Sequence, residues 1–269
     1  MSDREFVGSI PEVYDRCLGP MLFRPYAEDL ATRLADLPIR KALELAAGTG
    51  IATAEVAQRV PAGTRIVATD LQQAMLDVAA KRIDSEDVEF RAADAQDLPF
   101  ADDSFDAVYC QFGVMFLPDK DGAYREMHRV LAPGGTLVFS VWDRIESTPA
   151  AAAVASALAR YFPDDPPRFM SRTPHGYHDP ATIRDSVEAA GFTGVSVEAV
   201  TLPSGAPSAR EVAVGFCQGT PVRHEITARD ADGLSAVTDA VCEAVAERFG
   251  DGPVDATMAA FVVTARKHG

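Results

Sequence analysis

Residues 42–50, with the sequence ALELAAGTG, decide the fold of this chain. Residues 41–46 are a short apolar strand by composition, and the helix after the glycines runs to about Val60, where Pro61 and Gly63 stop it. Gly48 and Gly50 carry no Cβ, so a ligand can approach the backbone of the turn closely. Taken alone, the stretch is explained equally well by a ligand-binding turn and by a tight strand-to-helix turn that binds nothing.

The stretch opens an alternation of strands and helices. We expect strands at 65–70, 88–94, 105–111 and 136–142, and helices near 73–82 and 121–131. A helical leader, with Tyr26 and later leucines at helical spacing, precedes them and ends at Pro38. This alternation predicts right-handed crossovers and a mostly parallel, doubly wound sheet. Ligands of such sheets bind beyond the carboxyl ends of the strands.

The second half of the chain is less regular. Residues 161–180 are rich in proline and aromatic side chains and are too apolar for a linker, so we expect a packed excursion or lid. A helix follows, with Asp179 as its N-cap and Gly191 after its end. Strands at 195–201 and 256–266 complete a seven-stranded sheet with helical lid insertions. We expect one domain, 1–269, with a leader (1–38), a cofactor-binding core (39–145) and lid insertions (146–180 and 204–250).

Composition and charge narrow the class of partner. The chain has 269 residues, 47% hydrophobic and 24% charged, with a formal net charge of −15 and no cluster of Lys and Arg. Binding to nucleic acid needs a basic face, and an acidic surface repels anionic lipid, so neither is expected as a partner. No apolar run is long enough to span a bilayer, and the N-terminus MSDREFVGSI is not typical of a signal peptide, which favours a cytoplasmic location.

Metal and disulfide chemistry are not expected. The four cysteines are widely spaced with no C-x-x-C pair, and no carboxylate–histidine cluster has metal-ligand spacing.

Polar side chains stand where the predicted strands end. Asp70 lies 20 residues beyond Gly50, and its two carboxylate oxygens suit the two hydroxyls of a ribose, although it could also cap the next helix. Asp94 ends the third strand and can read the exocyclic amine of adenine. Further residues could line the same crevice, Leu71 and Met75 as apolar walls and Gln111 and Phe112 beyond the fourth strand.

At these residues the sequence resembles the Rossmann-like (class I) S-adenosylmethionine-dependent methyltransferases. ALELAAGTG is similar to their first motif, and 100–119 with 124–143 resemble the type 11 subgroup, which includes ubiquinone and menaquinone biosynthesis methyltransferases. The resemblance covers roughly 40–145. It implies that Glu44 faces the methionyl ammonium, directly or through water, and that the backbone near Ala46 and Gly48 lines the amino-acid tail. It also implies that Gly50 belongs to the cofactor site, that Asp70 binds the ribose, and that Asp94 and Ala95 bind adenine. Ala46 stands where many members have glycine.

The leader, VYDRCLGPMLFRPYAEDLA, resembles that of small-molecule members, which implies Tyr14 near the cofactor and Phe23 over the pocket; two aromatics that only bury a helix fit equally well. For the acceptor, Trp142 is a candidate wall, and His175, Tyr177 and His178 are candidates within TPHGYHDP, the first two as catalytic groups. A surface or capping role suits these loop histidines as well.

The favoured function is therefore transfer of a methyl group from S-adenosylmethionine to a small molecule, at O, N or C, by in-line displacement. Two alternatives remain open. Residues 48–53 are one glycine short of G-x-G-x-x-G, which leaves an NAD(P)-dependent oxidoreductase. A protein that binds S-adenosylmethionine without catalysis also fits. The segments outside the core are apolar enough to form a lid or the surface of a homodimer.

Overall fold

The computed structural model describes residues 8–269, which divide into two compact units. We call the part made of 26–142, 177–200 and 260–269 the sheet unit, and the part made of 8–25, 143–176 and 201–259 the helical unit. Each is described by itself. The helical unit contains most of the segments predicted as leader and lid insertions, while the expectation of a single domain stays a prediction.

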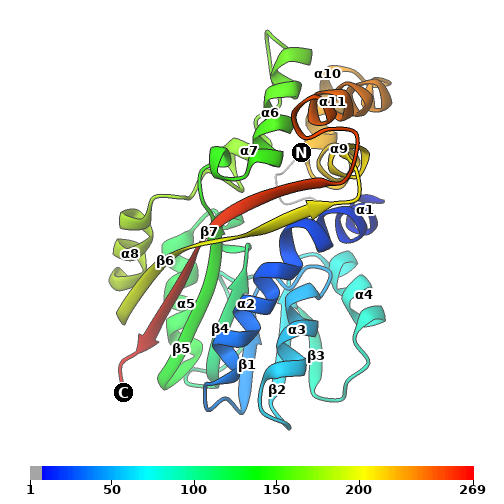
Figure 1. The fold of residues 1–269 in the computed structure, drawn as a ribbon. Coiled ribbons are helices and arrows are strands. Elements are labelled where there is room, and N and C mark those ends of the chain that lie inside the picture. Colours follow the sequence, from blue (N-terminus) through cyan, green and yellow to red (C-terminus); the bar gives the residue numbers. More distant parts are fainter. Residues whose placement is uncertain (1–7) are drawn as a thin grey trace. The chain divides into compact units, whose positions relative to one another are not determined.

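A seven-stranded sheet forms the core of the fold, in the order β3-β2-β1-β4-β5-β7-β6 (Figure 1). Strands β1 to β5 pair in parallel, and β7 runs antiparallel to β5. The order reverses between β1 and β4, as in a doubly wound sheet. The predicted mostly parallel α/β fold is thus confirmed. The strands are β1 (Lys41–Glu44), β2 (Arg65–Asp70), β3 (Val88–Ala92), β4 (Phe105–Gln111), β5 (Leu131–Trp142), β6 (Phe192–Ala206) and β7 (Val254–Lys267).

Helices cover the sheet because its central strands are apolar on both sides. Strand β4 is almost wholly buried, and Figure 1 shows α2 (Arg24–Ala35) and α3 (Ile51–Arg59) in front of the sheet and α5 (Lys120–Val130) behind it. Helix α4 (Gln73–Arg82) lies beside β2 and β3, and α8 (Pro180–Ala189) packs on α5. As predicted, Asp179 caps α8, since its carboxylate accepts the N–H groups of Ala181 and Thr182.

The helical unit is a cluster of helices around its own apolar core. Helix α9 packs on both the π-helix η1 and α11, and α11 also packs on α6. Val154, Val212 and Val241 are fully buried. The helices are α1 (Ile10–Val13), η1 (Tyr14–Phe23), α6 (Pro149–Tyr161), α7 (Phe169–Arg172), α9 (Ala209–Gln218), α10 (Val222–Arg229) and α11 (Leu234–Phe249). In the part of the chain that the structure describes, no helix is long and apolar enough to cross a membrane.

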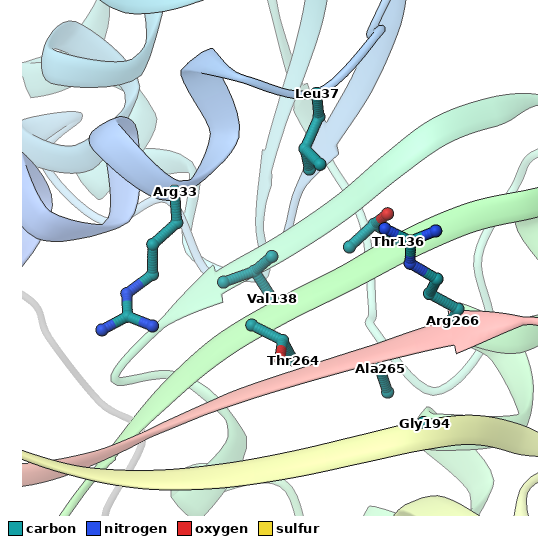
Figure 2. Close-up of a pocket in the computed structure, with 8 residues that line it drawn as sticks. All are labelled: Arg33, Leu37, Thr136, Val138, Gly194, Thr264, Ala265 and Arg266. Atoms are coloured by element: carbon teal, nitrogen blue, oxygen red, sulfur yellow. The ribbon is translucent and has the colours of Figure 1, made fainter.

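A hollow of about 210 Å³ opens on the sheet unit, lined by side chains of α2, β5 and β7 together with Leu37 and Gly194 (Figure 2). Thr136 lines it and pairs with Ala107 at the start of β4, so the hollow lies toward the amino-terminal ends of the parallel strands. The guanidinium of Arg33 on its rim already binds Asp29 and Glu198. The hollow is therefore distinct from the edge where ligands of such sheets bind.

Candidate functional site

The carboxyl ends of the first four strands meet at one edge of the sheet, where backbone hydrogen bonds join them. Beyond β1, the N–H of Leu45 donates to the carbonyl of Tyr109 in β4, and the N–H of Ala47 donates to Thr69 in β2, both at 2.9 Å. The N–H of Ala93 donates to the carbonyl of Asp70 at 3.1 Å. The structure thus brings together the strand ends that the sequence singled out.

The turn after β1 needs left-handed backbone at three positions. Ala46, Gly48 and Gly50 have φ values of 52°, 57° and 77°. A Cβ on Gly50 would lie 2.8 Å from the Cβ of Ala79 in α4, so only glycine fits there. A Cβ on Gly48 would meet nothing closer than Met75 Cε at 3.7 Å, which leaves space beside this backbone.

Asp70 fastens this turn to the start of α4. Its Oδ2 accepts the N–H of Gly48 at 2.9 Å, and its Oδ1 accepts the N–H of Gln72 at 2.8 Å. Burial raises the pKa of Asp70, and these backbone hydrogen bonds oppose the rise. Each carboxylate oxygen keeps a lone pair, so the same group can both hold the turn and accept hydroxyl groups.

Leu71 and Met75 differ in exposure. Leu71 directly follows Asp70, and its side chain is 46% exposed, whereas that of Met75 is buried. The carboxylate can accept hydrogen bonds from ribose hydroxyls, and the apolar face and the glycine backbone can contact the rest of an adenosine, so the residues present fit the adenosyl part of S-adenosylmethionine.

Glu44, at the end of β1, is buried with an exposed fraction of 1% and accepts a hydrogen bond from the hydroxyl of Tyr109 at 3.0 Å. Burial raises the pKa of Glu44 from 4.5 to about 8, and the hydrogen bond from Tyr109 opposes the rise. Glu44 is therefore mostly protonated at neutral pH. A buried carboxyl of this kind gains from a cation placed beside it. Sequence reasoning missed Tyr109 because it lies within the buried run of β4, where it is indistinguishable from an ordinary core residue.

Asp94 and Ala95 follow β3 at the same edge. Oδ1 of Asp94 accepts the backbone N–H of Gln96 at 3.0 Å and its side-chain Nε2 at 3.1 Å. Sequence reasoning also missed Gln96, whose side chain reaches the start of α5 through a hydrogen bond that no spacing rule reveals.

Beyond β4 lie Gln111 and Phe112, the latter with a φ of 53°. The ring of Phe112 stacks on Trp142 at the end of β5, with centroids 3.7 Å apart and planes at 4°, and Tyr26 meets both rings edge-on. Phe112 and Trp142 are each only 5% exposed. The two rings predicted to line the cofactor and acceptor sites thus cover one another, and Tyr26, which sequence reasoning assigned only to a helix, completes their cluster.

The remaining predicted residues are divided between the units. In the helical unit, Tyr14 and Phe23 stack at 4.6 Å at the two ends of η1, and His175 is buried with Nδ1 2.7 Å from the carbonyl oxygen of Asp143. In the sheet unit, Tyr177 lies with its hydroxyl 3.4 Å from that of Tyr124, and His178 is exposed. Of the three residues in TPHGYHDP, His175 is the one with a buried, oriented ring.

Within residues 8–269, no three His, Cys, Asp or Glu side chains are grouped to hold a metal ion.

Comparison with known proteins identifies the family. The model of the "Methyltransferase domain" family matches residues 43–139. A demethylmenaquinone methyltransferase of Clavibacter sepedonicus is 35% identical over 182 residues, which are 62% of this chain and 71% of that enzyme. A ubiquinone/menaquinone biosynthesis C-methyltransferase of Idiomarina loihiensis is 30% identical over 178 residues, 60% of this chain and 69% of that enzyme.

Solved structures share the fold at low identity. Phosphoethanolamine N-methyltransferase 2 of Haemonchus contortus, in complex with S-adenosyl-L-methionine, has a TM-score of 0.65 at 17% identity over all of this chain, which spans 60% of that enzyme. The cyclase SpnF has a TM-score of 0.59 at 22% identity, with 96% of this chain and 92% of that chain covered. Because a cyclase shares the fold, the fold alone does not show the activity.

Fold and sequence together define a Rossmann-like methyltransferase that uses S-adenosylmethionine. The chain belongs to the family of the demethylmenaquinone methyltransferases. The prediction of methyl transfer from S-adenosylmethionine to a small molecule is confirmed, and nothing supports an oxidoreductase or a non-catalytic binding protein.

Proposed function

We propose that this enzyme methylates a carbon of an electron-rich, hydroxylated aromatic ring of the hydroquinone class, at a cofactor site formed by the strand ends. The names of its relatives support the acceptor class, since they include demethylmenaquinone and ubiquinone/menaquinone C-methyltransferases. The single observation that carries the cofactor site is the carboxylate of Asp70, held against the N–H of Gly48 beside the exposed Leu71.

In this proposal the cofactor residues keep the roles that the resemblance implies. Asp70 accepts the ribose hydroxyls, Asp94 with Ala95 binds the adenine amine, and Leu71 and Met75 contact the ring. Glu44 faces the methionyl ammonium, the backbone near Ala46 and Gly48 lines the amino-acid tail, and Gly50 belongs to the same cofactor site. Gln111 and Phe112 close the site beyond β4, and Tyr14 contributes from the leader.

When bound, S-adenosylmethionine would supply a methyl group on a sulfonium: a bond forms between the ring carbon and this methyl carbon as the carbon–sulfur bond breaks, and S-adenosylhomocysteine is the leaving group. Most of the rate then comes from positioning and from exclusion of water, because the donor is already activated. The acceptor hydroxyl must lose its proton before attack and the ring carbon must lose one afterwards, so a base assists.

His175 is the base that we propose. A carbonyl oxygen can only accept a hydrogen bond, so the contact of Nδ1 with the carbonyl of Asp143 places the ring proton on Nδ1 and leaves the lone pair on Nε2. Asp143 directly follows Trp142, which ends β5. Tyr177, the other candidate, is less suited, because burial raises the pKa of its hydroxyl and Tyr124 holds it. Phe23, Trp142 and His178 stay predictions for acceptor contacts.

The partners and location follow the same proposal. We expect a small-molecule acceptor rather than nucleic acid, which the net charge of −15 supports. A cytoplasmic location is part of the same proposal. The homodimer surface of the lid segments stays a prediction.

A direct test is to incubate the enzyme with S-adenosylmethionine and a short-chain demethylmenaquinol, a catechol or an aromatic amine, and to follow S-adenosylhomocysteine and the product mass. We expect a product with a new ring-carbon methyl group from the quinol alone. His175→Gln should lower kcat about 100-fold or more with little change in the KM for S-adenosylmethionine. His268→Gln, at an exposed histidine to which no site role is assigned, is the matched control. Methylation only of the catechol oxygen or the amine would contradict the acceptor class.

A further inference from the structure

Residues 94–102 follow β3, and hydrogen bonds join this segment to helix α5 at two places. One lies near the C-terminus of α5 and the other at its N-terminus. Near its C-terminus, Arg129 donates from Nη1 to the carbonyl oxygen of Phe100 at 2.8 Å and from Nη2 to that of Leu98 at 3.0 Å. Glu126 accepts the N–H of Leu98 at 2.8 Å and also binds Arg129. The later part of the segment is therefore fixed to α5 by charged groups, which form the stronger kind of hydrogen bond.

At the N-terminus of α5 the contact is made by Gln96. Its Oε1 accepts the N–H of Asp119, the N-cap residue, at 2.9 Å, while its Nε2 donates to Oδ1 of Asp94 at 3.1 Å. One orientation of the amide satisfies both neighbours, because the N–H of Asp119 needs an acceptor and the carboxylate of Asp94 needs a donor. Gln96 thereby links the N-cap of α5 to the carboxylate.

The two hydrogen bonds from Gln96 use one oxygen of Asp94. Both its backbone N–H and its Nε2 reach Oδ1, at 3.0 and 3.1 Å, and among the residues that the structure describes no donor reaches Oδ2. A carboxylate held in this way has a fixed plane and one oxygen left for a ligand. An Asp on a loop without such a contact would rotate about χ1 and χ2. It would lose this freedom when a ligand bound, which costs binding free energy.

We propose that Gln96 is a positioning residue for recognition of the cofactor's adenine: it orients Asp94 so that Oδ2 accepts the exocyclic amine. The inference rests on the proposed role of Asp94. An adenine amine donates to this oxygen, whereas the 6-oxo group of hypoxanthine presents an acceptor to an acceptor. Selection of the amino purine over the oxo purine is therefore the property that Gln96 controls.

The test measures binding of S-adenosylhomocysteine and of its deaminated analogue, S-inosylhomocysteine, by titration calorimetry. We expect wild type to prefer the adenosyl ligand by at least tenfold. Gln96→Met removes both side-chain contacts. It should lower the affinity for S-adenosylhomocysteine about tenfold and change the affinity for S-inosylhomocysteine less than twofold. Gln96→Glu keeps the acceptor for Asp119 but turns a second carboxylate toward Asp94, so it should lose at least as much discrimination.

Gln73→Met is the matched control, because Gln73 makes an exposed hydrogen bond to Asp77 on α4. It should leave the preference unchanged. If Gln96 only stabilised the start of α5, Gln96→Glu would keep the preference of wild type, or both ligands would weaken equally, and either result would overturn the inference. A wild-type enzyme that binds both ligands equally would instead overturn the adenine role of Asp94.

Discussion

Replacement of Glu44 by Gln should remove a strong pH dependence of stability. The carboxyl is buried, and burial raises its pKa from 4.5 to about 8, so the folded protein holds a proton that the unfolded chain releases between these values. The contribution of Glu44 to stability is then greatest below pH 4.5, falls as the pH rises toward 8 and levels off above it. Gln keeps the side-chain oxygen that accepts the hydroxyl of Tyr109 and has no proton to lose.

The magnitude follows from the difference between the two pKa values. Each pH unit within the window is worth about 1.4 kcal/mol, so the full effect is on the order of 4–5 kcal/mol between pH 4.5 and 8. The free energy of unfolding of Glu44→Gln, relative to wild type, should therefore rise steadily from pH 4.5 to 8 and stay constant above pH 8. Taking the difference between the two proteins cancels the titration of groups that they share.

The assay is urea denaturation of both proteins at intervals from pH 5 to pH 9, with the free energy of unfolding compared at each pH. Glu55→Gln, at a half-buried position of α3 in an ion pair with Arg59, is the control and should show a difference that does not change with pH across this range. A wild-type minus Glu44→Gln difference that does not change with pH would refute the reasoning, because it would mean that Glu44 titrates alike in the folded and unfolded states.

Three further predictions concern the same edge of the sheet. A Cβ on Gly113 would lie 2.4 Å from the Cβ of Ala46, so Gly113→Ala should cost about 1–3 kcal/mol in denaturation, and Ala46→Gly should recover part of it; strict additivity of the two changes would contradict this contact. Arg129→Met should destabilise by about 2–3 kcal/mol, since it leaves the carbonyl oxygens of the held segment unpaired, whereas Arg125→Met should change little; equal effects would argue against that role. Binding of S-adenosylmethionine at pH 7 should release a proton from Glu44, seen as a binding enthalpy that depends on the buffer in wild type and less so in Glu44→Gln.

The strands of the sheet unit could be predicted closely because their patterns are local. Residues 65–70 and 105–111 are apolar runs bounded by turn residues, and both strands begin and end where predicted. Strand β5 was predicted too short. It begins at Leu131, so Pro133 to Gly135 lie within the strand, and the register with β4 shifts between Phe105 and Ala107. The prediction was wrong because proline and glycine normally indicate a turn.

The π-helix η1 could not be predicted, since its turns do not follow the helical period and Pro20 lies inside it.

The site shows the same division between local pattern and tertiary contact. Asp70, which ends β2, and Asp94, which lies two residues beyond the end of β3, could be found from the strand pattern, because parallel strands bring their carboxyl ends to one edge. Gln96 and Tyr26 could not, since their roles depend on contacts with Asp119 and Phe112, which lie 23 and 86 residues further along the chain. Trp142 was read as an open wall because a sequence does not show that Phe112 covers its face.

The central claim is that the carboxylate of Asp70 binds the cofactor at this edge, and calorimetric titration with S-adenosylhomocysteine tests it most directly. Wild type should bind, and Asp70→Ala should lose about 10- to 100-fold in affinity, since a charge-assisted hydrogen bond is worth about 1.5–3 kcal/mol. Asp77→Ala, on the exposed side of α4, should bind like wild type. Unchanged binding by a folded Asp70→Ala protein would contradict the account.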